Sequence, residues 1–159
     1  MNLVEGEDNI KAWLLQAGFQ RGDLRSEQLI EERSNCPMTW ACRKGQLSVC
    51  QWLFEMGAAR DICRANDKGT TPMIVACQEG HLSVCKWLVE VGAAEDISKS
   101  NNSGYTPMLW ACQEGHLAVC KWLVEVGAAE DISKADNKGY TPMLWACQEG
   151  HLSVCKWLV

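Results

Sequence analysis

Three stretches of the sequence place one histidine between two cysteines, with three residues in each gap. These residues are Cys77, His81 and Cys85, then Cys112, His116 and Cys120, and then Cys147, His151 and Cys155. Thiolate and imidazole groups are common zinc ligands, and an imidazole beside a thiol can activate that thiol as a nucleophile. The spacing therefore raises two hypotheses, a thiol or metal site and a cysteine-dependent catalytic site.

The near-identical copies argue against both hypotheses. The same segment occurs a fourth time between Cys42 and Cys50, where Gln46 replaces the histidine. No two cysteines have the Cys-x-x-Cys spacing that is typical of zinc sites, and a catalytic residue is normally unique in a chain. Free cysteine is among the residue types most often buried. We therefore expect the cysteines to pack in the core as free thiols, in a protein that is not an enzyme and holds no metal or cofactor.

Composition and charge narrow the class of partner. The chain has 159 residues, ten cysteines, eight tryptophans and a formal net charge of −5. Binding to a phosphate backbone or an anionic membrane needs positive charge, so we expect neither nucleic acid nor a membrane as partner. The N-terminal residues have no basic segment or apolar run, so no secretory signal is expected. Free thiols are typical of a reducing compartment, so we expect an intracellular, cytoplasmic protein.

A repeat with a period of 35 residues explains the copies. Alanine-cysteine pairs mark it at Cys42, Cys77, Cys112 and Cys147, and residues 104–124 match residues 139–159 at 20 of 21 positions. Such self-similarity is typical of repeat arrays. We divide the chain into a half repeat that caps the N-terminus (1–34), three repeats (35–68, 69–103 and 104–138) and a truncated fourth repeat (139–159).

Each repeat should contain two short helices. In the third repeat, Thr106 is a candidate N-cap and Pro107 fits the first helical position. Gly115 and His116 should end this helix, and a second helix should run to Gly127 before a loop over residues 128–133. Helices this short bury little apolar surface on their own, so the stability of the fold should come from the stacking of one repeat on the next. Tryptophans recur on both helices and should be the main contacts between repeats.

These residues identify a resemblance to the ankyrin repeat family. The segment GYTPMLWACQEGHL, residues 104–117, resembles the family pattern G-x-T-P-L-H-x-A-A-x-x-G-H-L, and WLVEVGA, residues 122–128, resembles L-L-x-x-x-G-A. The match covers residues 35–159. Three features depart from the family: Thr39, Ile74, Leu109 and Leu144 replace the histidine after T-P-L, the period exceeds the family's by two residues, and the first repeat has Cys36 where the others have the capping threonine.

The resemblance implies an all-α ankyrin solenoid of helix-turn-helix repeats joined by short β-hairpin loops. It also implies a non-catalytic, monomeric module that binds a protein partner on the concave face formed by hairpins and first helices. Hairpin tips vary between otherwise matching repeats, as exposed positions do. The partner-binding positions carried over are Arg43, Lys44, Asp67, Lys68, Thr70, Gln78, Glu79, Asn102, Ser103, Tyr105, Gln113, Glu114, Asn137, Lys138, Tyr140, Gln148 and Glu149.

Two alternatives stay open at this point. The chain could be a structural spacer within a longer array, with no partner of its own, or the cysteine and histidine spacing could still form a thiol or metal site. The sequence stops inside the expected second helix of the fourth repeat. We therefore expect it to be a fragment of a longer array.

Overall fold

The computed structural model describes residues 36–159, which form four successive helix pairs. The first helices of the pairs are α2 (Pro37–Arg43), α4 (Pro72–Gln78), α6 (Pro107–Gln113) and α8 (Pro142–Gln148). The second helices are α3 (Leu47–Glu55), α5 (Leu82–Glu90), α7 (Leu117–Glu125) and α9 (Leu152–Leu158). Short 3-10 helices follow at η1 (Ala58–Cys63), η2 (Ala94–Ser98) and η3 (Ala129–Ser133). The predicted cap, residues 1–34, lies outside the described residues.

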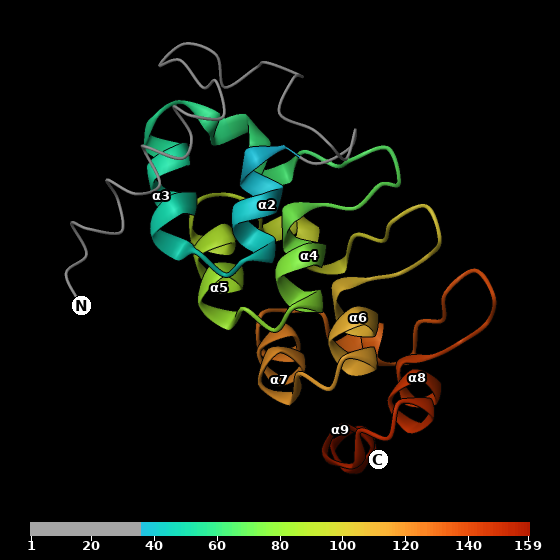
Figure 1. Cartoon of the computed structure of the whole chain (residues 1–159). Helices are drawn as coiled ribbons and strands as arrows, with labels where there is room; N and C mark the ends of the chain where they lie inside the picture. The colour runs from blue at the N-terminus through green and yellow to red at the C-terminus, as the bar shows by residue number, and fades with distance from the viewer. Residues whose placement is uncertain (1–35) are drawn as a thin grey trace.

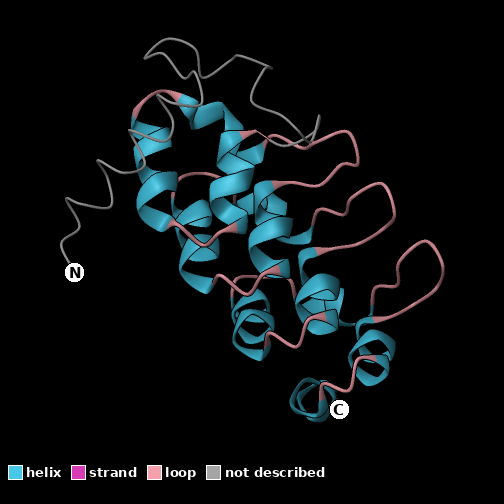
Figure 2. Ribbon diagram, in the orientation of Figure 1, coloured by secondary structure: helices cyan, strands magenta, loops and turns pink. Residues whose placement is uncertain are grey.

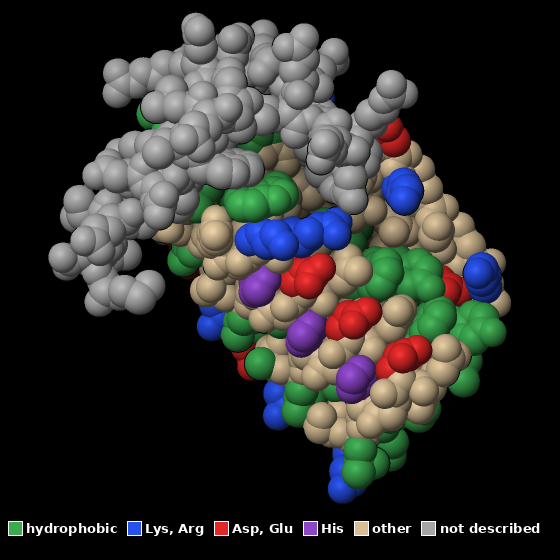
Figure 3. Space-filling model, viewed as in Figure 1, with side chains coloured by type: hydrophobic (Ala, Val, Ile, Leu, Met, Phe, Trp, Pro, Cys, Tyr) green, Lys and Arg blue, Asp and Glu red, His purple; other side chains and the backbone are tan. Residues whose placement is uncertain are grey.

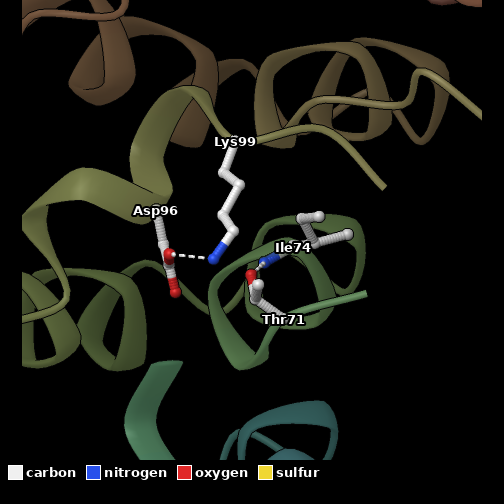
Figure 4. Close-up of polar contacts among 4 residues, drawn as sticks. All are labelled: Thr71, Ile74, Asp96 and Lys99. Atoms are coloured by element: carbon white, nitrogen blue, oxygen red, sulfur yellow. Dashed lines mark hydrogen bonds and ion pairs between the residues drawn. The ribbon is translucent and has the colours of Figure 1, made fainter. Parts of the chain in front are cut away.

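Threonine and proline begin three of the four first helices, as the sequence predicts. The Thr71 hydroxyl accepts a hydrogen bond from the Ile74 N–H at 3.3 Å (Figure 4). Thr106 caps α6 in the same way, at 3.2 Å from the Leu109 nitrogen. Such a cap satisfies an N–H group that otherwise lacks a partner in the first turn. At the start of α2, Cys36 makes no such bond, so α2 is the one first helix whose N-terminus lacks a side-chain cap.

The helices form two rows along the array (Figure 1). One row holds α2, α4, α6 and α8, in which each helix packs on the next, and the other holds α3, α5, α7 and α9. Met73, Leu88, Met108 and Leu123 are completely buried between the rows. The core therefore runs continuously from repeat to repeat, which confirms an all-α solenoid.

The loops that precede α4, α6 and α8 project on the same side of the array (Figure 2). No strand forms within residues 36–159, so the predicted hairpins are tight turns rather than strand pairs. The first is closed by a hydrogen bond from the Asn66 N–H to the Thr70 carbonyl, at 3.0 Å. The same bond recurs 35 residues later, between Asn101 and Tyr105.

The two tryptophan columns differ in their surroundings. Trp87 and Trp122, on second helices, are only 7% exposed, and Trp87 meets Phe54 of the preceding repeat edge to face at 5.9 Å. This column therefore connects repeats, as predicted. Trp110 and Trp145, on first helices, are half-buried and pack on the tyrosines of the turns, and Trp145 also approaches Tyr105 of the preceding repeat.

The 3-10 helices replace what the sequence indicated as a loop, and η2 and η3 each bury a carboxylate. Asp96 is 2% exposed and Asp131 is 4% exposed. One oxygen of Asp96 lies 3.4 Å from the Lys99 ammonium (Figure 4), and one of Asp131 lies 3.8 Å from the Lys134 ammonium. The second oxygen of each is buried without a hydrogen-bond partner. Burial raises the pKa of both carboxyl groups, and the neighbouring ammonium groups offset only part of that rise.

Candidate binding surface

Side chains hold the backbone of each turn in place. The Asn101 carboxamide oxygen accepts hydrogen bonds from the N–H groups of Ser103 and Tyr105, both at 3.0 Å. Asp136 does the same for Lys138 and Tyr140 at 2.9 Å. Asparagine and aspartate commonly satisfy a turn in this way. The tips are consequently ordered before any partner arrives.

Asparagine side chains also tie each turn to the turn before it. The Asn102 amide group donates to the Asp67 carbonyl at 3.1 Å, and its backbone N–H donates to the Lys68 carbonyl at 2.9 Å. Asn137 repeats this arrangement on the carbonyls of Asn102 and Ser103. The sequence predicted Asn102 and Asn137 as contacts for a partner. In the structure both remain exposed, but their amides already bridge neighbouring turns.

This bridge leaves room only for glycine at the facing position. Gly69 has a φ of +74°, and a Cβ atom there would lie 2.5 Å from the Asn102 carboxamide oxygen. Gly104 faces Asn137 in the same way. These glycines are therefore needed both for the left-handed turn and for the close approach of the next repeat.

Two of the three histidines link successive repeats. His81 Nε2 donates to the Arg43 carbonyl oxygen at 2.9 Å, and His116 Nε2 donates to the Gln78 carbonyl at the same distance. The nearby Cys77 and Cys85 sulfur atoms lie 3.5 Å from each other and are buried. The cysteine and histidine spacing does not bring three ligands together, and no cluster of three metal-ligating side chains occurs between residues 36 and 159. Repetition of Gly-His at the period was the signal for this role, which the sequence analysis missed.

An aromatic group lines the surface beside the last two turns. The Tyr105 ring packs on Trp110 with 4.7 Å between centroids and approaches Trp145 at 6.0 Å. Tyr140 packs on Trp145 at 5.1 Å and is 39% exposed. We call Tyr105, Trp110, Tyr140 and Trp145 the aromatic group. Tyr105 and Tyr140 were both predicted contacts, but only Tyr140 is largely accessible, because Tyr105 lies between two tryptophans.

Asp136 lies at the centre of the aromatic group. The Trp145 indole N–H donates to its free carboxylate oxygen at 3.4 Å. Burial alone would raise the pKa of Asp136, but hydrogen bonds from the N–H groups of Tyr140 and Lys138, and from the Trp145 and Tyr105 side chains, lower it below its usual value. Burial and the same carboxylate raise the pKa of the Tyr105 hydroxyl. At neutral pH the pair is thus a carboxylate and a neutral phenol.

Charged side chains form a row along the ends of the first helices. Glu79, Glu114 and Glu149 are exposed at equivalent positions, and we call them the acidic row. Figure 3 shows acidic side chains running beside the histidines, with basic side chains at one end and hydrophobic ones alongside. Lys44 occupies the equivalent position in the first repeat, next to Arg43.

The remaining predicted residues differ in exposure. Asp67, Lys68, Ser103 and Lys138 are exposed at the tips, whereas Thr70 is half-buried. Gln78 and Gln113 are half-buried. Gln148 is exposed, and its amide group donates a hydrogen bond to the Glu149 carboxylate at 3.3 Å. The predicted residues therefore differ in how free they are to contact a partner.

A family model of ankyrin repeats, with three copies, matches residues 4–100 and 91–159. No curated protein matches the chain. Within residues 36–159, every helix is too short to cross a membrane.

Proposed function

Because the chain belongs to the ankyrin repeat family, we propose that it binds a protein partner across its turns and first helices. Ankyrin repeats are generally protein–protein interaction modules, and the family is typically non-enzymatic. The proposal adds the binding face and its residues. We further propose that the protein is monomeric and cytoplasmic and that its partner is neither a nucleic acid nor a membrane. A net charge of −5 and ten free thiols support this.

The exposed part of the aromatic group carries the proposal. Tyr140 presents a large amphipathic ring that is already held against Trp145. A tyrosine fixed in this way contributes contact area while losing little conformational entropy on binding. Asparagine bridges between turns hold the surrounding backbone, so the surface is ordered in advance. The neighbouring acidic row favours a partner segment that carries positive charge.

The competing function is a structural spacer without a partner. Turns that only connect repeats would have the same backbone and the same hydrogen bonds between turns. The two functions differ in what surface substitutions do. In a spacer, replacing an exposed side chain on the turns has the same effect as replacing one on the second helices. In a binding module, only the turns and first helices matter.

Affinity capture with matched variants tests this difference. We expect Tyr140→Ala and Glu114→Ala to reduce recovery of a specific partner from cell lysate, each by about 1–2 kcal/mol in affinity once that partner is purified. Lys121→Ala, exposed on α7, should leave recovery unchanged. Circular dichroism checks that all three variants fold. Equal recovery by all variants would support the spacer, and equal loss on both faces would contradict the proposed binding face.

A further inference from the structure

An exposed charged residue follows each of the first three first helices. Lys44 follows α2, Glu79 follows α4 and Glu114 follows α6, and we call these three residues the charged row. The helix pairs of Glu79 and Glu114 each have a neighbouring pair on both sides, so stacking of repeats leaves these positions exposed. Along the row the charge changes sign once, from positive at the first pair to negative at the next two.

The described part of the chain does not neutralise these charges. Between residues 36 and 159, the ion pairs all lie in or directly after the 3-10 helices, and none includes a residue of the charged row. Glu79 and Glu114 are also the C-caps of their helices, where the last backbone carbonyls carry partial negative charge and favour a cation. A cationic side chain of a partner would therefore meet a carboxylate and a helix C-terminus at the same place.

Hydrogen bonds between repeats hold the charged row at a fixed spacing. His81 Nε2 donates to the carbonyl of Arg43, directly before the first charged residue, at 2.9 Å. His116 Nε2 donates at the same distance to the carbonyl of Gln78, directly before the second. The positions of the charges are therefore set before a partner binds, and a partner gains most when its own charges have the same spacing.

The spacing of the charged row fits one extended conformation of a peptide. The first helices pack on one another, and packed helices lie roughly 8–10 Å apart. A polyproline II segment has three residues per turn and rises about 3.1 Å per residue, so every third side chain points to the same side, about 9 Å from the last. Figure 3 shows the acidic side chains in one line, with basic side chains at its end.

We propose that the protein partner lays a polyproline II segment along the charged row, with an acidic side chain at one end and basic side chains at every third residue after it. The acidic side chain pairs with Lys44, and the basic side chains pair with Glu79 and Glu114. The inference rests on the proposed binding function, to which it adds the conformation, charge order and charge spacing of the bound segment.

Titration of the isotope-labelled full chain with synthetic peptides, followed by NMR chemical shifts, tests the spacing. The probes are EPPKPPK and its reverse KPPKPPE, which cover both chain directions, and PPEKKPP, which has the same composition with its charges adjacent. We expect one of the first two peptides to bind at least about threefold more tightly than PPEKKPP, because only a spaced peptide can form all three ion pairs at once.

A charge reversal tests the order of the charges. In Glu114→Lys the preference should change from EPPKPPK, in its tighter direction, to EPPKPPE. Glu125→Lys, exposed on α7, raises the net charge by the same amount and should keep the preference of the unsubstituted chain. Attraction between net charges alone would give both variants the same preference. Glu79→Lys, which should prefer EPPEPPK in its tighter direction, is a second reversal within the row, and circular dichroism checks that the variants fold.

Several results would overturn the inference. They are equal binding of spaced and clustered peptides, no binding of any peptide at millimolar concentration, or the same preference in Glu114→Lys and Glu125→Lys. If one of them occurs while Tyr140→Ala still lowers recovery of a partner from lysate, the binding face stands and only the segment is wrong. If Tyr140→Ala and Glu114→Ala also leave recovery unchanged, the proposed function itself fails.

Discussion

At the scale of single residues, Asp96 and Asp131 are costly to bury as carboxylates. Each has one oxygen near a lysine ammonium and one with no partner. Burial raises both pKa values in the folded protein above those in the unfolded chain. The folded state therefore binds protons more tightly, and the contribution of these residues to the free energy of unfolding falls as pH rises through the raised pKa values.

Replacing both carboxylates should remove this pH dependence. We expect Asp96→Asn combined with Asp131→Asn to be more stable than the unsubstituted chain at pH 7. That difference should shrink as the pH falls through the raised pKa values toward 3.8, the ordinary aspartate value. Urea unfolding at a series of pH values measures it. Asp67→Asn, at an exposed tip, serves as the control and should show no such trend. A constant difference across the series would contradict the assignment.

At the scale of elements, the Gly-His turn between the helices of each repeat connects it to its neighbour. A Cβ atom on Gly80 would lie 2.5 Å from His116 Nδ1, and Gly45 has the same relation to His81. Gly150 has a φ of +78°, as Gly80 does, but nothing lies within 4 Å of the corresponding position. The two glycines therefore share a backbone requirement and differ only in the stacked imidazole.

Comparing substitutions at Gly80 and Gly150 separates the cost of backbone strain from the cost of disturbing the contact with the next repeat's histidine. We expect Gly150→Ala to cost about 1–2 kcal/mol for its left-handed backbone. Gly80→Ala should cost about 1–3 kcal/mol more, because it also displaces His116 from the Gln78 carbonyl. Equilibrium urea unfolding measures both, and the double variant Gly80→Ala with His116→Ala should cost less than the sum of its parts. Equal costs for the two alanine variants would exclude a role for the stack.

The sequence predicted the elements better than their contacts. Thr106 and Pro107 mark the start of α6 because capping depends only on neighbours in the chain. The 3-10 helix around Asp131 was missed, since it packs on α8 of the next repeat, a contact that crosses between repeats. Tyr105 was taken as a free contact for the same reason: the ring of Trp145 that covers it is 40 residues away in sequence.

At the scale of the whole molecule, the last helix pair exposes residues that the inner pairs bury. Leu144 is 52% exposed, whereas Leu109 and Ile74 at the equivalent positions are fully buried. Leu152 is 63% exposed, whereas Leu117 and Leu82 are half-buried. This apolar end has the same composition as the surfaces on which inner repeats stack. We propose that a further repeat fits it.

Extending the chain tests the fit. A copy of residues 125–159 joined after Val159 continues the register, and it should cover Leu144 and Leu152. Half-burying two leucines should add roughly 1.5–3 kcal/mol to the stability of this end. Urea unfolding followed by tryptophan emission measures the change. A tail of equal length made of glycine and serine is the control, and equal midpoints for the two extensions would contradict the proposal.

The bonds that cross each junction give the array the mechanics of springs in series. Histidine-to-carbonyl bonds join the first repeat to the second and the second to the third, and asparagine bridges join the second to the third and the third to the fourth. Each repeat touches only its neighbours, so every junction carries the full load while the extensions add. A longer array would therefore stretch more under a given force, yet the force that parts it would still be the strength of its weakest single junction.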